Sequence, residues 1–86
     1  MSARKLYRLP EVERIGIALE HVGRRVWLTY SANRDGDEET YAGQLVSVAR
    51  TFFGTVGHIV VLREGRDSTG DRAFSLATVA RIEPMV

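Results

Sequence analysis

The chain has 86 residues, of which 44% are hydrophobic and 27% charged, and its formal net charge is +1. This length allows a single domain with a thin hydrophobic core. The sequence contains no cysteine, which excludes disulfides and thiolate metal sites. The near-neutral charge excludes a global attraction to nucleic acid or to an anionic membrane. Self-association is one remaining way to bury more surface, and we expect it.

No targeting or membrane segment is expected. No apolar run approaches the roughly 20 residues that span a bilayer, and the N-terminal basic residues are followed by Pro10 and acidic residues instead of an apolar stretch. We therefore expect a soluble, cytoplasmic protein with no membrane partner. All of the 12 basic residues except Lys5 are arginine, which is typical of a GC-rich genome or, alternatively, of bidentate and stacking contacts.

Residues 1–9 are predicted to be a flexible basic arm, and residues 10–86 a single helix-plus-barrel domain. The helix begins near Pro10, because proline suits the first helical position and acidic residues follow it in the first turn. Gly23 is a stop signal. Four apolar residues recur between them at helical spacing: Val12, Ile15, Leu19 and Val22. A strand using Ile15, Ile17 and Leu19 is the alternative.

From Arg25 the apolar period changes to two, which predicts β-strands. Gly43 lies in the interior of the second strand, where glycine is tolerated mainly at a sharp bend of the sheet. We therefore predict an all-β fold, a small five-stranded barrel with an N-terminal α-helix, built around Val26, Leu28, Leu45 and Ile82. Closure would remove the edge strands, whereas an open barrel would leave an edge to pair with a second copy. The expected strands are 25–30, 40–49, 59–63, 73–76 and 79–83.

The sequence resembles the Sm-like family. The segments Gly-Arg-Arg-Val-Trp-Leu-Thr-Tyr, Tyr-Ala-Gly-Gln-Leu-Val-Ser-Val and Ile-Val-Val-Leu are similar to its first half, and Phe-Ser-Leu-Ala-Thr-Val-Ala-Arg-Ile-Glu-Pro to its last strand pair. SH3-like barrels share nearly the same features. The Sm-like resemblance implies a homo-oligomeric ring that binds single-stranded RNA through the loops after strands two and four. Ala49 and His58 stand near the family's Asp and Asn positions, and the family's Arg-Gly pair is missing from the second loop.

The candidate RNA-binding residues gather in the loop after the second strand. Phe52 and Phe53 would form a stacking platform for bases, with Arg50 available for phosphate. His58 would stack on a base or hydrogen-bond to it. The basic arm would assist electrostatically through Arg4, Lys5 and Arg8. The structural alternative is that one phenylalanine plugs the barrel, the other packs on a neighbouring subunit, and His58 only caps the loop.

Other residues are weaker candidates. Trp27 is expected to pack beneath the helix or, alternatively, to anchor an interface together with Phe53. His21 suits the end of a helix. The two histidines and the acidic run at residues 35–39 lack the spacing of metal sites, so we expect no metal and no cofactor.

The sequence therefore predicts a non-enzymatic binding module, since no nucleophile and base are marked as a set. The first hypothesis is an Sm-like homo-oligomer that contacts single-stranded RNA. The second is a protein–protein adaptor, such as a small phage or mobile-element protein that docks on a host protein. The third is a ligand-sensing regulatory domain, because the C-terminal segment also resembles the WYL domain.

Overall fold

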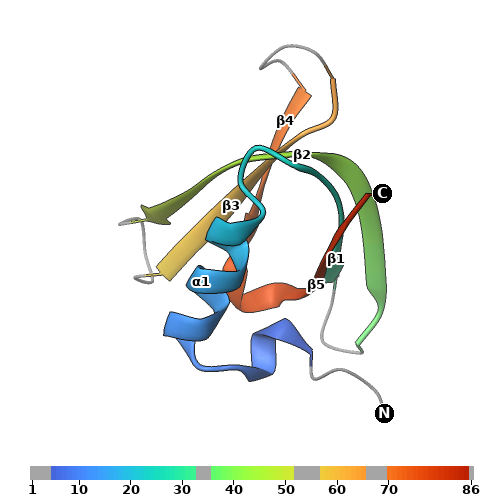
Figure 1. Cartoon of the computed structure of the whole chain (residues 1–86). Helices are drawn as coiled ribbons and strands as arrows, with labels where there is room; N and C mark the ends of the chain where they lie inside the picture. The colour runs from blue at the N-terminus through green and yellow to red at the C-terminus, as the bar shows by residue number, and fades with distance from the viewer. Residues whose placement is uncertain (1–4, 33–35, 52–56, 66–69, 86) are drawn as a thin grey trace.

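The computed structural model describes residues 5–32, 36–51, 57–65 and 70–85, and it shows a curved β-sheet with one α-helix on its concave side (Figure 1). The prediction of a mostly β fold with an N-terminal α-helix is confirmed. None of the helices in the described part is long and apolar enough to cross a membrane. In chain order the elements are η1 (Leu6–Arg8), α1 (Glu11–Glu20), β1 (Arg25–Ser31), β2 (Glu38–Thr51), β3 (Gly57–Arg63), β4 (Asp71–Ser75), η3 (Leu76–Thr78) and β5 (Val79–Pro84).

The helix α1 has the expected start and stop signals. Pro10 is its N-cap, one position before the first helical residue, and Glu11 and Glu13 occupy the first turn. There the carboxylates face the positive end of the helix dipole. After the helix, Gly23 adopts a φ of 88°, which glycine adopts without steric cost. Its N–H donates to the carbonyl of Leu45 at 2.7 Å, which joins the helix end to β2.

The five strands form one antiparallel sheet in the order β4-β3-β2-β1-β5. Among the described residues no ladder joins β4 to β5, so the sheet is open and these strands are its edges. Between them η3 forms the turn. The long strand β2 exceeds the predicted bounds because Glu38 still pairs with Ser31 and Thr51 with Gly57. Register shifts interrupt the β1–β5 and β2–β3 ladders, and such bulges increase strand bending.

The long strand β2 bends over the rest of the sheet (Figure 1), and Gly43 lies in the interior of this strand. A Cβ atom at this position would lie 2.6 Å from the carbonyl oxygen of Arg63 and 3.0 Å from Cγ of Leu62. The first distance is too short for a real Cβ atom unless the backbone moves, and the second requires the Leu62 side chain to shift by a few tenths of an ångström. The end of β3 therefore approaches β2 as closely as it does only because residue 43 has no side chain.

The core lies between the concave face of the sheet, α1 and η1. Its members include the four residues expected from the strand pattern, and the prediction of this core is confirmed. Leu6 of η1 belongs to the core as well, so part of the segment predicted to be an arm packs against the domain. The buried apolar residues are Leu6, Ala18, Val26, Leu28, Leu45, Val60, Leu62, Leu76, Val79, Ala80 and Ile82.

The burial of α1 differs from what its apolar spacing suggests. Ala18 is fully buried and Ile15 packs against the core. In contrast, Val12 is 81% exposed and Leu19 is 55% exposed. The helix rests on the sheet through a small residue and its flanks, and this orientation turns much of its apolar stripe outward.

Candidate functional site

The predicted RNA-binding loop joins β2 to β3, and the structure describes its two flanks. Arg50 is exposed near the end of β2 and lies opposite His58 in the ladder. Phe52 and Phe53 lie outside the described residues. Of the predicted RNA-binding residues in this loop, the structure places Arg50 and His58 side by side.

His58 makes a specific contact within the protein. Its Nδ1 lies 2.9 Å from Oε1 of Glu11 in the first turn of α1, although the two residues are far apart in sequence. The imidazole is 23% exposed. This contact ties the start of α1 to the start of β3, so His58 has a structural role whether or not it contacts a ligand.

The basic residues of the N-terminal segment have different surroundings. Arg4 lies outside the described residues, and Arg8 is exposed in η1. Lys5 Nζ lies 2.8 Å from Oε2 of Glu38 at the start of β2. The hydrogen bond to Glu38 raises the pKa of Lys5, and the same bond lowers the pKa of Glu38. The charge of Lys5 is thus balanced inside the protein.

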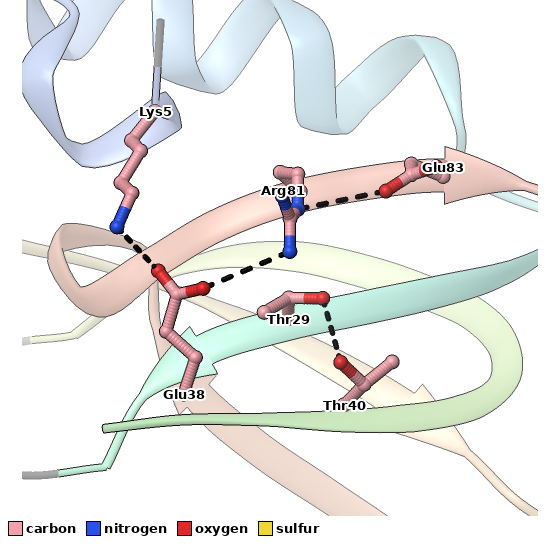
Figure 2. Close-up of polar contacts among 6 residues, drawn as sticks. All are labelled: Lys5, Thr29, Glu38, Thr40, Arg81 and Glu83. Carbon is pink, nitrogen blue, oxygen red and sulfur yellow. Dashed lines mark hydrogen bonds and ion pairs between the residues drawn. The ribbon is translucent and has the colours of Figure 1, made fainter. Parts of the chain in front are cut away.

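Glu38 connects three parts of the fold (Figure 2). Besides Lys5 it faces Arg81 of β5, whose guanidinium lies 3.7 Å from Oε1. Beside this network Thr29 and Thr40 share a hydroxyl hydrogen bond of 2.9 Å across β1 and β2. Together these contacts fasten the N-terminal segment and β5 to the start of β2.

A cluster of three aromatic rings, contributed by three strands, was not predicted. Tyr30 of β1 and Tyr41 of β2 are stacked, with centroids 5.9 Å apart and an interplanar angle of 21°. Phe74 of β4 lies 4.9 Å from Tyr30 and 5.7 Å from Tyr41. All three rings are half-buried and pack against the core. We call Tyr30, Tyr41 and Phe74 the ring cluster.

Charged groups border the ring cluster. The guanidinium of Arg72 lies 4.8 Å from the centroid of Tyr41, within the range of a cation–π contact, and it also pairs with Glu64 at 3.1 Å. The hydroxyls of Tyr30 and Tyr41 both donate to Oε2 of Glu39, at 2.8 and 3.4 Å. The hydrogen bond to Glu39 raises the pKa of Tyr30 to about 12. Three aromatic rings can stack on a planar group, and the neighbouring guanidinium can pair with an anion.

The alternation of side chains along the strands could have predicted part of this cluster. Tyr30 shares a face with Val26 and Leu28, and Tyr41 shares a face with Gly43 and Leu45. The pairing register that brings the two tyrosines together is not encoded locally. The sequence pattern does not place Phe74 in the cluster either, because its ring reaches Tyr30 only when the sheet curls.

Trp27 projects from the opposite face of β1. It is 48% exposed and lies between Ala42 of β2 and Glu83 of β5 in the ladders. The two exposed arginines of this face are Arg25, on the same strand, and Arg81, on β5. The exposed indole fits the interface reading of the sequence better than a position beneath the helix.

An apolar groove of about 450 Å³ runs between the N-terminal helices and the edge strand β5. Its apolar lining residues are Leu6, Leu9, Ile17, Ala80 and Ile82. Because β5 pairs only with β1 in the described part, the groove lies next to a free sheet edge.

No group of three potential metal ligands occurs among the residues that the structure describes. Comparisons of the chain with protein-family models, with curated proteins and with solved structures found no match.

Proposed function

We propose that this chain is a non-enzymatic binding module, a self-associating Sm-like barrel that contacts single-stranded RNA. Support for the architecture comes from the curved antiparallel sheet of five strands (Figure 1) and from Gly43, which the end of β3 approaches closely. The strand pattern and this glycine are the features on which the Sm-like resemblance rests. The two free edges and the small core favour association with further copies.

The observation that carries the RNA proposal is the ring cluster with Arg72 over one of its rings. Proteins that bind single strands combine stacking rings with cations, and each stacked base contributes roughly 1–3 kcal/mol. Half-exposed rings give such a base a surface to stack on, and the guanidinium offers a contact to phosphate. Arg50 adds a second exposed guanidinium at the end of β2.

The test is fluorescence anisotropy with a labelled oligouridine at low salt. We expect binding that weakens steeply as salt is added, because phosphate contacts release counterions. Tyr41→Ala is expected to lower affinity about tenfold, which corresponds to roughly 1.4 kcal/mol. Arg72→Gln should reduce the salt dependence as well as the affinity.

Two controls separate stacking from other effects. Tyr41→Phe keeps the ring and removes only the hydroxyl, so it should bind as the parent does. Tyr7→Ala removes an aromatic ring from η1, outside the ring cluster, and should leave affinity unchanged. Absence of binding at low salt, or equal losses for Tyr7→Ala and Tyr41→Ala, would contradict the proposal.

A protein–protein adaptor is the second candidate, and the groove beside β5 favours it. An extended peptide can add to a free strand edge while its side chains enter an adjacent apolar groove. If the chain is an adaptor, a pull-down with it should retain one protein stoichiometrically after nuclease treatment. Leu9→Asp, which places a charge in the groove, should abolish this retention. RNA binding without any retained protein would decide for the first candidate.

A further inference from the structure

The outward face of α1 is an apolar surface with a gap at Gly16, which we call the notch. Val12 and Leu19 are the exposed apolar residues of the helix, and Gly16 lies between them, one turn from each. A Cβ atom at Gly16 would meet nothing within 4 Å. The glycine therefore has no packing role within the subunit, although it costs the helix about 1 kcal/mol relative to alanine.

The charges on this face are negative. Glu13 and Glu20 are both exposed and lie on the same side of the helix as Gly16. They are seven residues apart, which places them about 10 Å from each other along the helix axis. Arg14, the one arginine of α1, points elsewhere, because its guanidinium donates to the carbonyl of Tyr7 at 3.1 Å.

The outer face of β1 has the opposite pattern. Trp27 is its exposed apolar residue, and Arg25 lies two positions before it on the same face. Arg81 lies opposite Thr29, two positions after Trp27. Arg25 lies four residue steps, about 13 Å, from this row along the strand, and Arg81 lies one inter-strand spacing, about 4.8 Å, to the side. The two arginines are therefore about 14 Å apart, and they flank the indole at a wider spacing than that of the two glutamates.

The arginines can reach a partner. Arg81 is paired at 3.7 Å with Glu38 and at 3.6 Å with Glu83. Both contacts are long, and the one with Glu83 is solvent-exposed on both sides, whereas Glu38 is half-buried. An exposed pair such as Arg81–Glu83 contributes little to folding, so Arg81 can exchange it for a carboxylate of another molecule. Glu83 is the one acidic residue directly opposite Trp27.

We propose that α1 of one copy docks on the outer face of β1 in a second copy. The indole of Trp27 enters the notch at Gly16, between Val12 and Leu19. Glu13 and Glu20 then pair with Arg25 and Arg81. The two surfaces are different, so the contact is heterologous, and repeated contacts build a ring or an open chain.

The partner is a second copy of the chain because the two faces differ in shape and in charge in a complementary way. One face is an apolar notch beside two glutamates, and the other is an exposed aromatic ring beside two arginines and one glutamate, Glu83. This inference rests on the self-association part of the proposed function and not on RNA binding. It names the interface that the association uses.

The first test compares the solution mass of variants by sedimentation. The parent is expected to sediment as an oligomer, whereas Gly16→Arg and Trp27→Ser are expected to sediment at the monomer mass of 9.6 kDa. Gly16→Arg fills the notch without a clash inside the subunit, so its thermal unfolding should not be impaired. The matched control is Gly57→Arg, since a Cβ atom there also meets nothing within 4 Å, and it should remain oligomeric.

The second test exchanges the charges. The double variant Glu13→Arg with Glu20→Arg should be monomeric because its two faces are both basic. The double variant Arg25→Glu with Arg81→Glu should be monomeric because both are acidic. An equimolar mixture restores opposite charges at every contact, and it should assemble.

Each result decides the proposal. A monomeric parent, an oligomer that persists in Gly16→Arg and Trp27→Ser, or a mixture of the charge variants that stays monomeric would overturn it. An oligomer that persists in these variants would leave the proposed self-association intact and place it elsewhere, for example at the sheet edges. The anisotropy measurement with oligouridine separately decides the RNA proposal.

Discussion

The ring of Phe74 on β4 lies 4.9 Å from the ring of Tyr30 on β1, although two strands lie between β4 and β1 in the sheet. Neighbouring strands are about 4.8 Å apart, so a flat sheet would separate β4 from β1 by about 14 Å. The contact therefore requires a strongly curled sheet, and the ring cluster seals part of its concave side.

Removing the ring of Phe74 should destabilise the fold. Burial of a whole phenylalanine contributes about 3–5 kcal/mol relative to alanine, and Phe74 is half-buried. We expect Phe74→Ala to lower the free energy of unfolding by about 2 kcal/mol, measured by urea denaturation. Ser75→Ala, at an exposed position of the same strand, should leave it nearly unchanged. Equal stability of the two variants would mean that the rings do not support the curled sheet.

Gly43 should not tolerate a side chain. The methyl group of Gly43→Ala would lie 2.6 Å from the carbonyl oxygen of Arg63, and overpacking of this kind costs about 1–3 kcal/mol. Denaturant unfolding measures the loss. Gly57→Ala is the matched control in a strand, because nothing lies within 4 Å of its Cβ position. A Gly43→Ala variant as stable as this control would exclude close approach of β3 as the reason for the glycine.

The phenol of Tyr30 should lose its proton at an unusually high pH. Its hydrogen bond to Glu39 raises its pKa from 10.0 to about 12, so the folded state favours the neutral phenol. The resulting contribution to stability is complete below pH 10 and is lost as the pH rises toward 12. Ultraviolet absorbance of tyrosinate should show the ionisation of Tyr30 at high pH, and Glu39→Gln should move this ionisation to lower pH. If the tyrosines titrate identically in the two proteins, the bond does not hold the proton.

The Lys5–Glu38 pair should hold the N-terminal segment in a pH-dependent way. Lys5 lowers the pKa of Glu38, so this contribution is present above the ordinary glutamate pKa and is lost as the pH falls through the lowered value. Because the pair is partly exposed to solvent, we expect a small effect that salt weakens. Amide hydrogen exchange should be faster at Leu6 and Leu9 in Glu38→Gln. The double variant Glu38→Gln with Lys5→Met should exchange no faster than Glu38→Gln alone. A further increase in the exchange rate would show that the two residues act separately.

Much of the local structure could be read from the residues themselves. The helix start after Pro10, the stop at Gly23, the period of two after Arg25 and the position of Gly43 inside a strand depend on neighbouring residues or on backbone conformation. All four were predicted, and the core residues followed from strand alternation. The strand ends were less accurate, because pairing partners such as Ser31 and Gly57 extend β2 beyond its apolar pattern.

Only the tertiary structure decided which side chains meet. Sequence periodicity identified Val12 and Leu19 as an apolar stripe, but the packing of Ala18 on the sheet turned them outward. Likewise, Glu11 reaches His58, Glu38 links Lys5 to Arg81, and Phe74 reaches Tyr30 because the sheet curls. Local residue patterns specify elements, since hydrogen bonding and alternation act over a few residues. Contacts between distant elements depend on register and curvature, which the whole chain determines together.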